Sequence, residues 1–313
     1  MSSYQSMARA WIVRLSALSI FVPATALATF SIAACDAETG ACGVAVATHN
    51  LAVGNSVPFA VSELGAGVSQ FETNPQHATV IVESLRAGSA AKDAISEALD
   101  RDSEFPDGLG AAYRQLGVVR FSGDATAYTG SEAGGYAGHQ TTRFASVQGN
   151  GLASEDVLTS MLDRFEHSEG PLAERLLGAL EAGYAAGGQT IGVTSAALLV
   201  ATPQGWPVDI DLRVDFAPGT AIVDLRQMLD ATTARTLLFR ARRSNNPEEA
   251  KDFALQSTRL APTWDRIWLG AAQLAARLGD DETARANFRR FAELNPVWAE
   301  RLAPEFEASL QPE

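Results

Sequence analysis

The sequence TFSIAAC at residues 29–35, the turn-like stretch DAETGA at 36–41 and the sequence GVAVAT at 43–48 decide the fold. Both flanking stretches are short, mostly apolar and free of proline, which is typical of strands in a buried sheet. The stretch between them carries Asp, Thr and Gly, residues that favour turns. The sequence therefore predicts a β-hairpin whose first strand begins at Thr29.

Pairs of helices alternate with groups of two or three strands after this hairpin. A helix is predicted from Asn74-Pro75 to about residue 85, with Asn74 as its cap and Pro75 in the first helical position. A second helix is expected after Ser89. Further strands are predicted at 115–120, 125–129, 144–148, 195–201 and 208–214, and further helices at 154–167 and 171–186. This order predicts an α+β domain in which two sheets pack face to face with helices outside them.

Residues 231–313 are helical in pattern and contain an internal repeat. Leu260–Trp264 recurs as Leu294–Trp298, and Asn246–Ala250 aligns with Asp280–Ala284 at the same offset. That offset equals the tetratricopeptide period, and Trp268, Ala284, Phe288 and Pro296 fall where helices of such repeats interlock. We therefore expect domains at 29–230 and 231–313, with the few repeats docked on the first domain.

Residues 1–28 have the pattern of a signal peptide. Arg9 and Arg14 precede the apolar run 15–22, Pro23 breaks that run, and the small residues at 26–28 suit a cleavage site. The apolar run is too short for a permanent membrane anchor. The sequence predicts export to the periplasm or the medium, with a mature chain that begins at Thr29.

Cys35 leaves two questions open. Ile32–Cys35 resembles a lipoprotein cleavage box, although cleavage there would delete the first predicted strand. Cys35 and Cys42 could also form a disulfide at the base of the hairpin, or they could be packed as free thiols. Their spacing does not suggest a metal site, and no cofactor is implied.

The net charge of the chain limits the classes of partner that it can bind. The chain has a net charge of −13, and removal of residues 1–28 takes away two arginines and no acidic residue, which gives −15. Such an acidic balance argues against nucleic acid or an anionic membrane surface as a partner. Beyond the leader no segment has the length and apolarity of a membrane helix, so no stable membrane insertion is expected. The sequence does not indicate an oligomeric state.

Cleavage after Ala28 would leave Thr29 with a free α-amine beside its own hydroxyl. The amine has a reference pKa of about 7.7–8.0, so it can accept the hydroxyl proton near neutral pH. Thr29 would then combine a nucleophile and its base in one residue. The alternative is that Thr29 is only the place where a signal peptidase cuts.

The predicted sheet domain also resembles a known family. Segments that span nearly all of residues 29–226, in the same order, resemble the DUF1028 family of bacterial proteins: Thr29–Ile32, Gly43–Ala47, Ala52–Gly54, Thr73–Pro75, Arg114–Val119, Tyr128–Gly130, Ala137–His139, Gln148–Asn150 and Pro171–Leu177. The family is similar in fold to the N-terminal nucleophile (Ntn) hydrolases. The resemblance implies a four-layer αββα sandwich and attack on an amide bond by the first residue of the mature chain.

Five polar residues are candidates to assist Thr29. His49 follows the second strand, where family members often carry a similar Ser-His, so it could tune the amine or hold substrate; it could equally be a surface residue. Asn74, Gln148 and Asn150 are candidate oxyanion donors, although Asn74 is also a helix cap and the other two lie in a turn-like sequence. His139, in a glycine-rich loop, is a weaker candidate for substrate binding.

Two segments depart from the family pattern. Gly134-Gly135-Tyr136 stands where many relatives have a Cys and a Trp, and 187–194 lacks the charged residues that relatives carry before Ser-Ala-Ala. The substrate could therefore differ. The hypothesis from sequence is an exported Ntn hydrolase acting on a small amide or peptide. The competing hypothesis is a non-catalytic periplasmic protein that uses the sandwich and helical repeats to bind a peptide or protein partner.

Overall fold

The computed structural model describes residues 28–205 and 208–310. Its first sheet has the strand order β10-β9-β2-β1-β8-β7, and every neighbouring pair is antiparallel. The strands of this sheet are β1 Thr29–Cys35, β2 Cys42–Thr48, β7 Tyr136–Thr141, β8 Ala145–Leu152, β9 Ser195–Ala201 and β10 Ile210–Val214. β1 is therefore an interior strand, paired with β2 on one side and β8 on the other.

The second sheet has the order β3-β4-β5-β6, also antiparallel. It comprises β3 Pro58–Val61, β4 Gly65–Phe71, β5 Arg114–Arg120 and β6 Asp124–Thr129. Two helices, α1 Gln76–Arg86 and α2 Ala91–Asp100, follow β4 in the chain. Three short 3-10 turns complete this part: Val53–Asn55, Asp102–Glu104 and Ala111–Tyr113.

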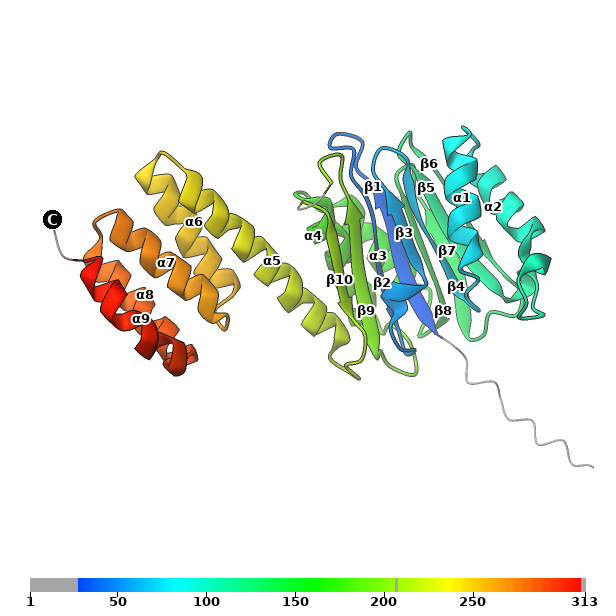
Figure 1. The fold of residues 1–313 in the computed structure, drawn as a ribbon. Helices are drawn as coiled ribbons and strands as arrows, with labels where there is room; N and C mark the ends of the chain where they lie inside the picture. The colour runs from blue at the N-terminus through cyan, green and yellow to red at the C-terminus, as the bar shows by residue number, and fades with distance from the viewer. Residues whose placement is uncertain (1–27, 206–207, 311–313) are drawn as a thin grey trace, which may run out of the picture.

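Three clusters of buried apolar residues show how the helices and sheets pack in layers. Helices α1 and α2 pack on the outer face of the second sheet through a core that contains Ile81, Ile95 and Leu116. Helices α3 Asp156–Glu166 and α4 Leu172–Ala185 pack on the outer face of the first sheet. Between the sheets lies a third core whose members include Val44 and Val68. Figure 1 shows the two sheets side by side with α1 and α2 on one flank.

Cys35 and Cys42 form a disulfide that joins β1 and β2 next to their connecting turn. Both residues belong to the core between the sheets and are at most 2% exposed. Of the two alternatives that the sequence left open, the structure thus has the disulfide.

Five helices follow the sheets: α5 Ala221–Arg243, α6 Pro247–Leu260, α7 Asp265–Arg277, α8 Asp281–Leu294 and α9 Pro296–Ala308. The side chains of Asn246 and Asp280, which the repeat aligns with each other, both cap a helix: Asn246 accepts from two backbone N–H groups of α6, and Asp280 accepts from one of α8. α5 contacts β9 and β10 at its start and α6 and α7 further along, so it joins the sheet lobe to the helical lobe (Figure 1). The expected boundary between residues 230 and 231 lies inside this continuous helix.

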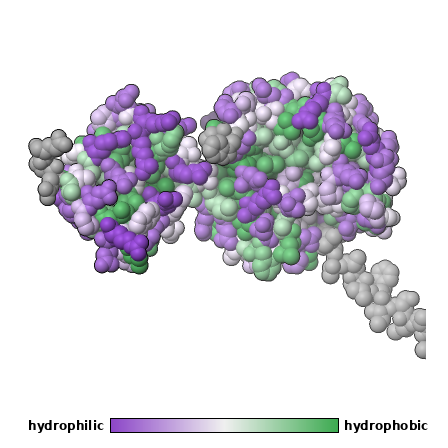
Figure 2. Space-filling view, viewed as in Figure 1, coloured by the Kyte–Doolittle hydropathy of each residue, from purple (hydrophilic) through white to green (hydrophobic). Residues whose placement is uncertain are grey.

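The predicted α+β arrangement of two sheets with helices is confirmed, and the structure adds that both sheets are antiparallel. The structure adds three strands that the sequence pattern did not predict, β3, β4 and β7. Figure 2 shows hydrophilic side chains over much of the surface and apolar ones gathered on the sheet lobe beside its junction with the helical lobe. Within the described part of the chain, no helix combines the length and apolarity needed to cross a bilayer. The expected signal peptide lies almost wholly in residues 1–27, outside the described residues.

Candidate functional site

The space between the two sheets is apolar at one end and polar at the other. Alternate residues of β1 face this space, and the series Thr29, Ser31, Ala33, Cys35 changes from polar to apolar along the strand. Neighbouring strands contribute polar side chains at the same level, all of them buried: Gln70, Gln115, Ser146, Gln148 and Asn150. Burial of polar groups is unfavourable unless they are hydrogen-bonded. The hydrogen-bond partners of these side chains therefore define the site.

Thr29 begins the central strand and is 3% exposed. Its backbone nitrogen, which is a peptide nitrogen in the full-length chain, donates to Asn150 Oδ1 at 3.2 Å. Its hydroxyl lies 3.1 Å from Thr48 Oγ1, and Thr48 donates its single hydroxyl proton to the carbonyl oxygen of Ala28 at 2.7 Å. Since that proton is used, the Thr29 hydroxyl must be the donor between the two threonines.

A chain of hydrogen bonds runs from Thr29 to the protein surface. Asn150 Nδ2 donates to Gln115 Oε1 at 2.8 Å, which fixes the amide so that its oxygen faces Thr29. Gln115 Nε2 donates to Thr129 Oγ1 at 3.0 Å, and Thr129 Oγ1 lies 2.9 Å from Nδ1 of the exposed His139. Partial desolvation of the imidazole lowers the pKa of His139. The structure thus links three sequence-predicted residues, Thr29, Asn150 and His139.

Gln148 belongs to the same group of buried polar side chains, opposite Ser31, which lies two residues along β1 from Thr29. Its Nε2 donates to Ser31 Oγ at 2.7 Å, and its Oε1 accepts from Ser146 at 2.7 Å. Ser31 in turn donates to Gln70 Oε1 at 2.7 Å. Gly117 of β5 faces Gln148 so closely that a Cβ there would overlap its amide. Gln148 is therefore held by structural partners rather than aimed at Thr29.

Asn74 lies in a separate buried cluster. Its Oδ1 accepts from Gln76 N at 3.0 Å at the start of α1, and its Nδ2 donates to Asp102 at 2.9 Å. Arg114, which is fully buried, donates from Nε to both oxygens of Asp102 at 2.9 Å. The contacts of Asn74 are structural, but the expected cap is wrong: the N-cap of α1 is Pro75, and the Asn74 Oδ1 bond closes a turn just ahead of the helix. α1 begins at Gln76, one residue later than expected.

The same cluster contains a Ser-His-Asp line that the sequence did not reveal. Ser69 Oγ lies 3.1 Å from His77 Nδ1, and His77 Nε2 lies 3.0 Å from Asp102 Oδ1. Burial lowers the pKa of His77, against an opposing effect of Asp102, whose charge Arg114 balances. All three residues are at most 2% exposed and lie on the helix side of β4, away from Thr29 and the space between the sheets. The line is a structural element.

His49 lies beside Thr29 because it follows Thr48, the register partner of Thr29. Its side chain is exposed, and its backbone N–H donates to the Ala28 carbonyl at a long 3.5 Å. The 187–194 segment, which departs from the family pattern, also lies next to Thr48 and His49. Thr190 N donates to Gly151 O at 3.1 Å, and Thr194 N donates to Thr48 O at 2.7 Å.

Sequence reasoning missed Thr48, Gln115 and Thr129. Thr48 could have been found, because a Cys35–Cys42 pair at the base of a hairpin places Thr29 opposite Thr48 in register. Gln115 and Thr129 come from the other sheet, and no local signal ties them to Thr29. Among the described residues, no group of His, Cys, Asp and Glu could hold a metal ion.

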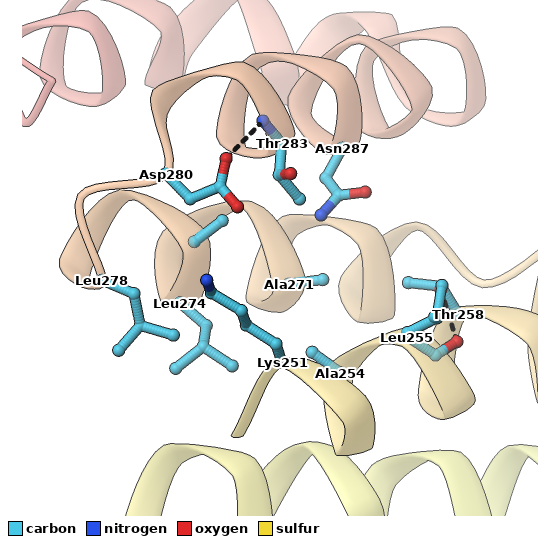
Figure 3. Close-up of a pocket in the computed structure, with 11 residues that line it drawn as sticks. Lys251, Ala254, Leu255, Thr258, Ala271, Leu274, Leu278, Asp280, Thr283 and Asn287 are labelled. Atoms are coloured by element: carbon cyan, nitrogen blue, oxygen red, sulfur yellow. Dashed lines mark hydrogen bonds between the residues drawn. The ribbon is translucent and has the colours of Figure 1, made fainter. Parts of the chain in front are cut away.

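Two cavities of the described chain lie away from Thr29. One, of about 80 Å³, is lined by residues of α6, α7 and α8, among them Lys251, Leu274 and Asn287 (Figure 3). The other, of about 350 Å³, has a charged lining that includes Arg164, Arg175 and Arg226. Arg226 is already paired with Glu174 and Glu181. Thr29 lines neither cavity.

Comparison with known proteins gives one family. Residues 29–225 match the family described as "Family of unknown function (DUF1028)", and the chain belongs to it. A crystal structure of protein SPO2555 from Silicibacter pomeroyi, of the same family, is similar with a TM-score of 0.60 and 36% sequence identity. The similarity covers 66% of this chain and 86% of that one. No curated protein matches.

Proposed function

We propose that residues 1–28 are a leader whose removal makes Thr29 the first residue, and that the mature protein is an exported Ntn hydrolase that cleaves an amide bond. One observation carries this proposal. The residue at which the family match begins lies at the tip of the central strand, inside a buried polar network that binds both its nitrogen and its hydroxyl.

The network supplies what a terminal threonine needs. Asn150 Oδ1 is an acceptor, so it would bind the amine of a free Thr29 and orient its lone pair toward the hydroxyl. Gln115 keeps that amide from turning. In this proposal Asn150 positions the base, and Gln148 and Asn74 are structural, which replaces the oxyanion role expected from sequence. The order of helix, sheet, sheet and helix layers also supports the similarity to Ntn hydrolases.

The reaction balances with water as the co-reactant. The Thr29 hydroxyl oxygen attacks the amide carbon while the α-amine takes the hydroxyl proton. The C–N bond then breaks, and the proton passes from the ammonium to the leaving amine. Water attacks the resulting ester through the same amine, which releases a carboxylic acid and restores Thr29. The overall change is amide plus water to acid plus amine.

Export agrees with two features of the chain. A signal peptide would carry it to an oxidising compartment, where the Cys35–Cys42 disulfide is stable. We propose a periplasmic or secreted location on these grounds.

A second candidate function is a binding protein. The cavity along α6–α8, with apolar walls, Lys251 on one side and Asn287 on the other, favours this interpretation (Figure 3). In it the tetratricopeptide-like helices, capped by Asn246 and Asp280, hold a peptide or protein partner. Such a protein has no reason to react at Thr29.

Acylation of the exported protein separates the two functions. The mature protein is treated with p-nitrophenyl acetate, and the adduct is located by mass spectrometry and challenged with hydroxylamine, which releases an ester but not an amide. We expect a releasable acetyl group on Thr29, its loss in Thr29→Ala and its retention in Thr29→Ser. Thr141→Ala, which removes the hydroxyl of an exposed threonine at the end of β7, is the matched control. A wild-type protein without an adduct on Thr29 would contradict the proposal.

A further inference from the structure

Ala28 is buried beside Thr29 in the full-length chain. It is 1% exposed. Its carbonyl oxygen accepts hydrogen bonds from Thr48 Oγ1 at 2.7 Å and from the backbone N–H of His49 at 3.5 Å. Two donors on β2 and its following turn therefore converge on the carbonyl that is attached to the Thr29 nitrogen.

These donors have the arrangement of an oxyanion hole. Tetrahedral intermediates of acyl transfer are stabilised by fixed N–H and O–H groups aimed at the developing negative charge. The nitrogen and Oγ1 of Thr29 are separated by two carbon atoms, so a carbonyl attached to Oγ1 lies next to the place where the Ala28 carbonyl now lies. Once Ala28 has gone, Thr48 Oγ1 and His49 N lose their acceptor and face that place.

Gly151 forms one wall of the position that Ala28 occupies. Gly151, with a φ of +61°, lies so close that a Cβ on it would be 2.6 Å from the Ala28 Cβ. The Thr190 N–H, by binding Gly151 O, holds the 187–194 segment against the same wall. On the Gly151 side, the position that Ala28 leaves thus has room for one methyl group on the α-carbon and no more.

We propose that the position left by Ala28 is the acyl subsite of the mature enzyme, that Thr48 Oγ1 and His49 N–H are its oxyanion donors, and that it takes short acyl groups such as acetyl or propionyl. This inference rests on the proposed function and specifies its substrate class as amides of short carboxylic acids. Thr48 is then a catalytic residue, because its hydroxyl touches the reacting oxygen.

The test uses a series of p-nitrophenyl esters on mature protein whose N-terminus has been verified. Acetate and propionate should acylate Thr29 at similar rates, and butyrate should be slower by at least about tenfold, since one methylene in a closed pocket changes rates by that order. Thr48→Val keeps the shape but removes the hydroxyl. It should slow acetylation by about 10²–10³-fold, the effect of losing one oxyanion donor. Thr141→Val, the same change on exposed β7, is the control.

The outcomes are distinct. Equal rates of Thr29 acylation by acetate, butyrate and hexanoate would overturn the short-acyl subsite while leaving Thr29 a nucleophile. A Thr48→Val protein that is acetylated as fast as wild type would overturn the oxyanion assignment. No acylation of Thr29 by any ester would remove the proposed function itself. The wild-type ester series decides the subsite even if Thr48→Val does not fold.

Discussion

Replacing Gln115 by methionine tests whether the buried polar network is satisfied as described. Gln115 is fully buried, and its Oε1 accepts hydrogen bonds from Asn150 Nδ2 and from Gln70 Nε2, both at 2.8 Å. Methionine has a similar length but no amide, so these two buried groups lose that partner. Each buried polar group left unpaired costs about 1–3 kcal/mol. The sum, about 2–6 kcal/mol, is a large part of a typical stability of about 5–15 kcal/mol.

Urea unfolding followed by far-UV circular dichroism measures this loss. Circular dichroism is preferred over fluorescence because the tryptophans among the described residues, Trp264, Trp268 and Trp298, lie in the helical lobe. Gln140→Met is the matched control, since Gln140 donates one hydrogen bond at an exposed site, to Thr159 Oγ1 at 3.1 Å. Its expected change is within about 0.5 kcal/mol. Equal unfolding midpoints for the two variants would refute the proposed network.

Three further predictions concern stability. Burial lowers the pKa of His77 in the folded state, whereas the unfolded state binds a proton at this side chain below about pH 6.5. The free energy of unfolding should therefore fall as the pH drops below that value. His77→Gln should flatten this part of the profile of urea midpoint against pH. Gly117→Ala should destabilise by about 1–3 kcal/mol because its Cβ displaces the Gln148 amide, whereas Gly110→Ala, which faces open space, should be close to wild type in thermal unfolding. Reduction of the disulfide should lower stability by about 2–4 kcal/mol, measured as the shift in urea midpoint with and without dithiothreitol; an unchanged midpoint would show that the bond does not constrain the chain.

The outline of the fold could be predicted because its central elements have clear local patterns. β1 and β2 are short apolar runs around a turn, and their observed bounds agree with the expected ones to within a residue. β4, Gly65–Phe71, was missed because Ser69 and Gln70 interrupt its apolar pattern. Those side chains are polar because their partners lie on other strands and helices, which a local pattern cannot reveal.

The candidate site could be predicted only in part. Thr29 could be identified as a candidate from the predicted cleavage of the leader, and Asn150 from a segment that resembles the family. The role of Asn150 does not follow, because it depends on which amide atom faces Thr29, and that is set by Gln115, which lies on a distant strand of the other sheet. β7, the edge strand that carries His139, has no apolar alternation, so its pairing with β8 was not visible. Register between strands decides which polar residues meet.

A free amine on Thr29 in the mature protein is the central claim, and the N-terminus of the exported protein tests it most directly. The full-length chain is expressed with its leader, the secreted or periplasmic product is purified, and Edman sequencing is combined with intact mass. We predict a chain that begins Thr29-Phe30-Ser31-Ile32. A product that keeps Ala28, or that begins at Cys35, would contradict the claim.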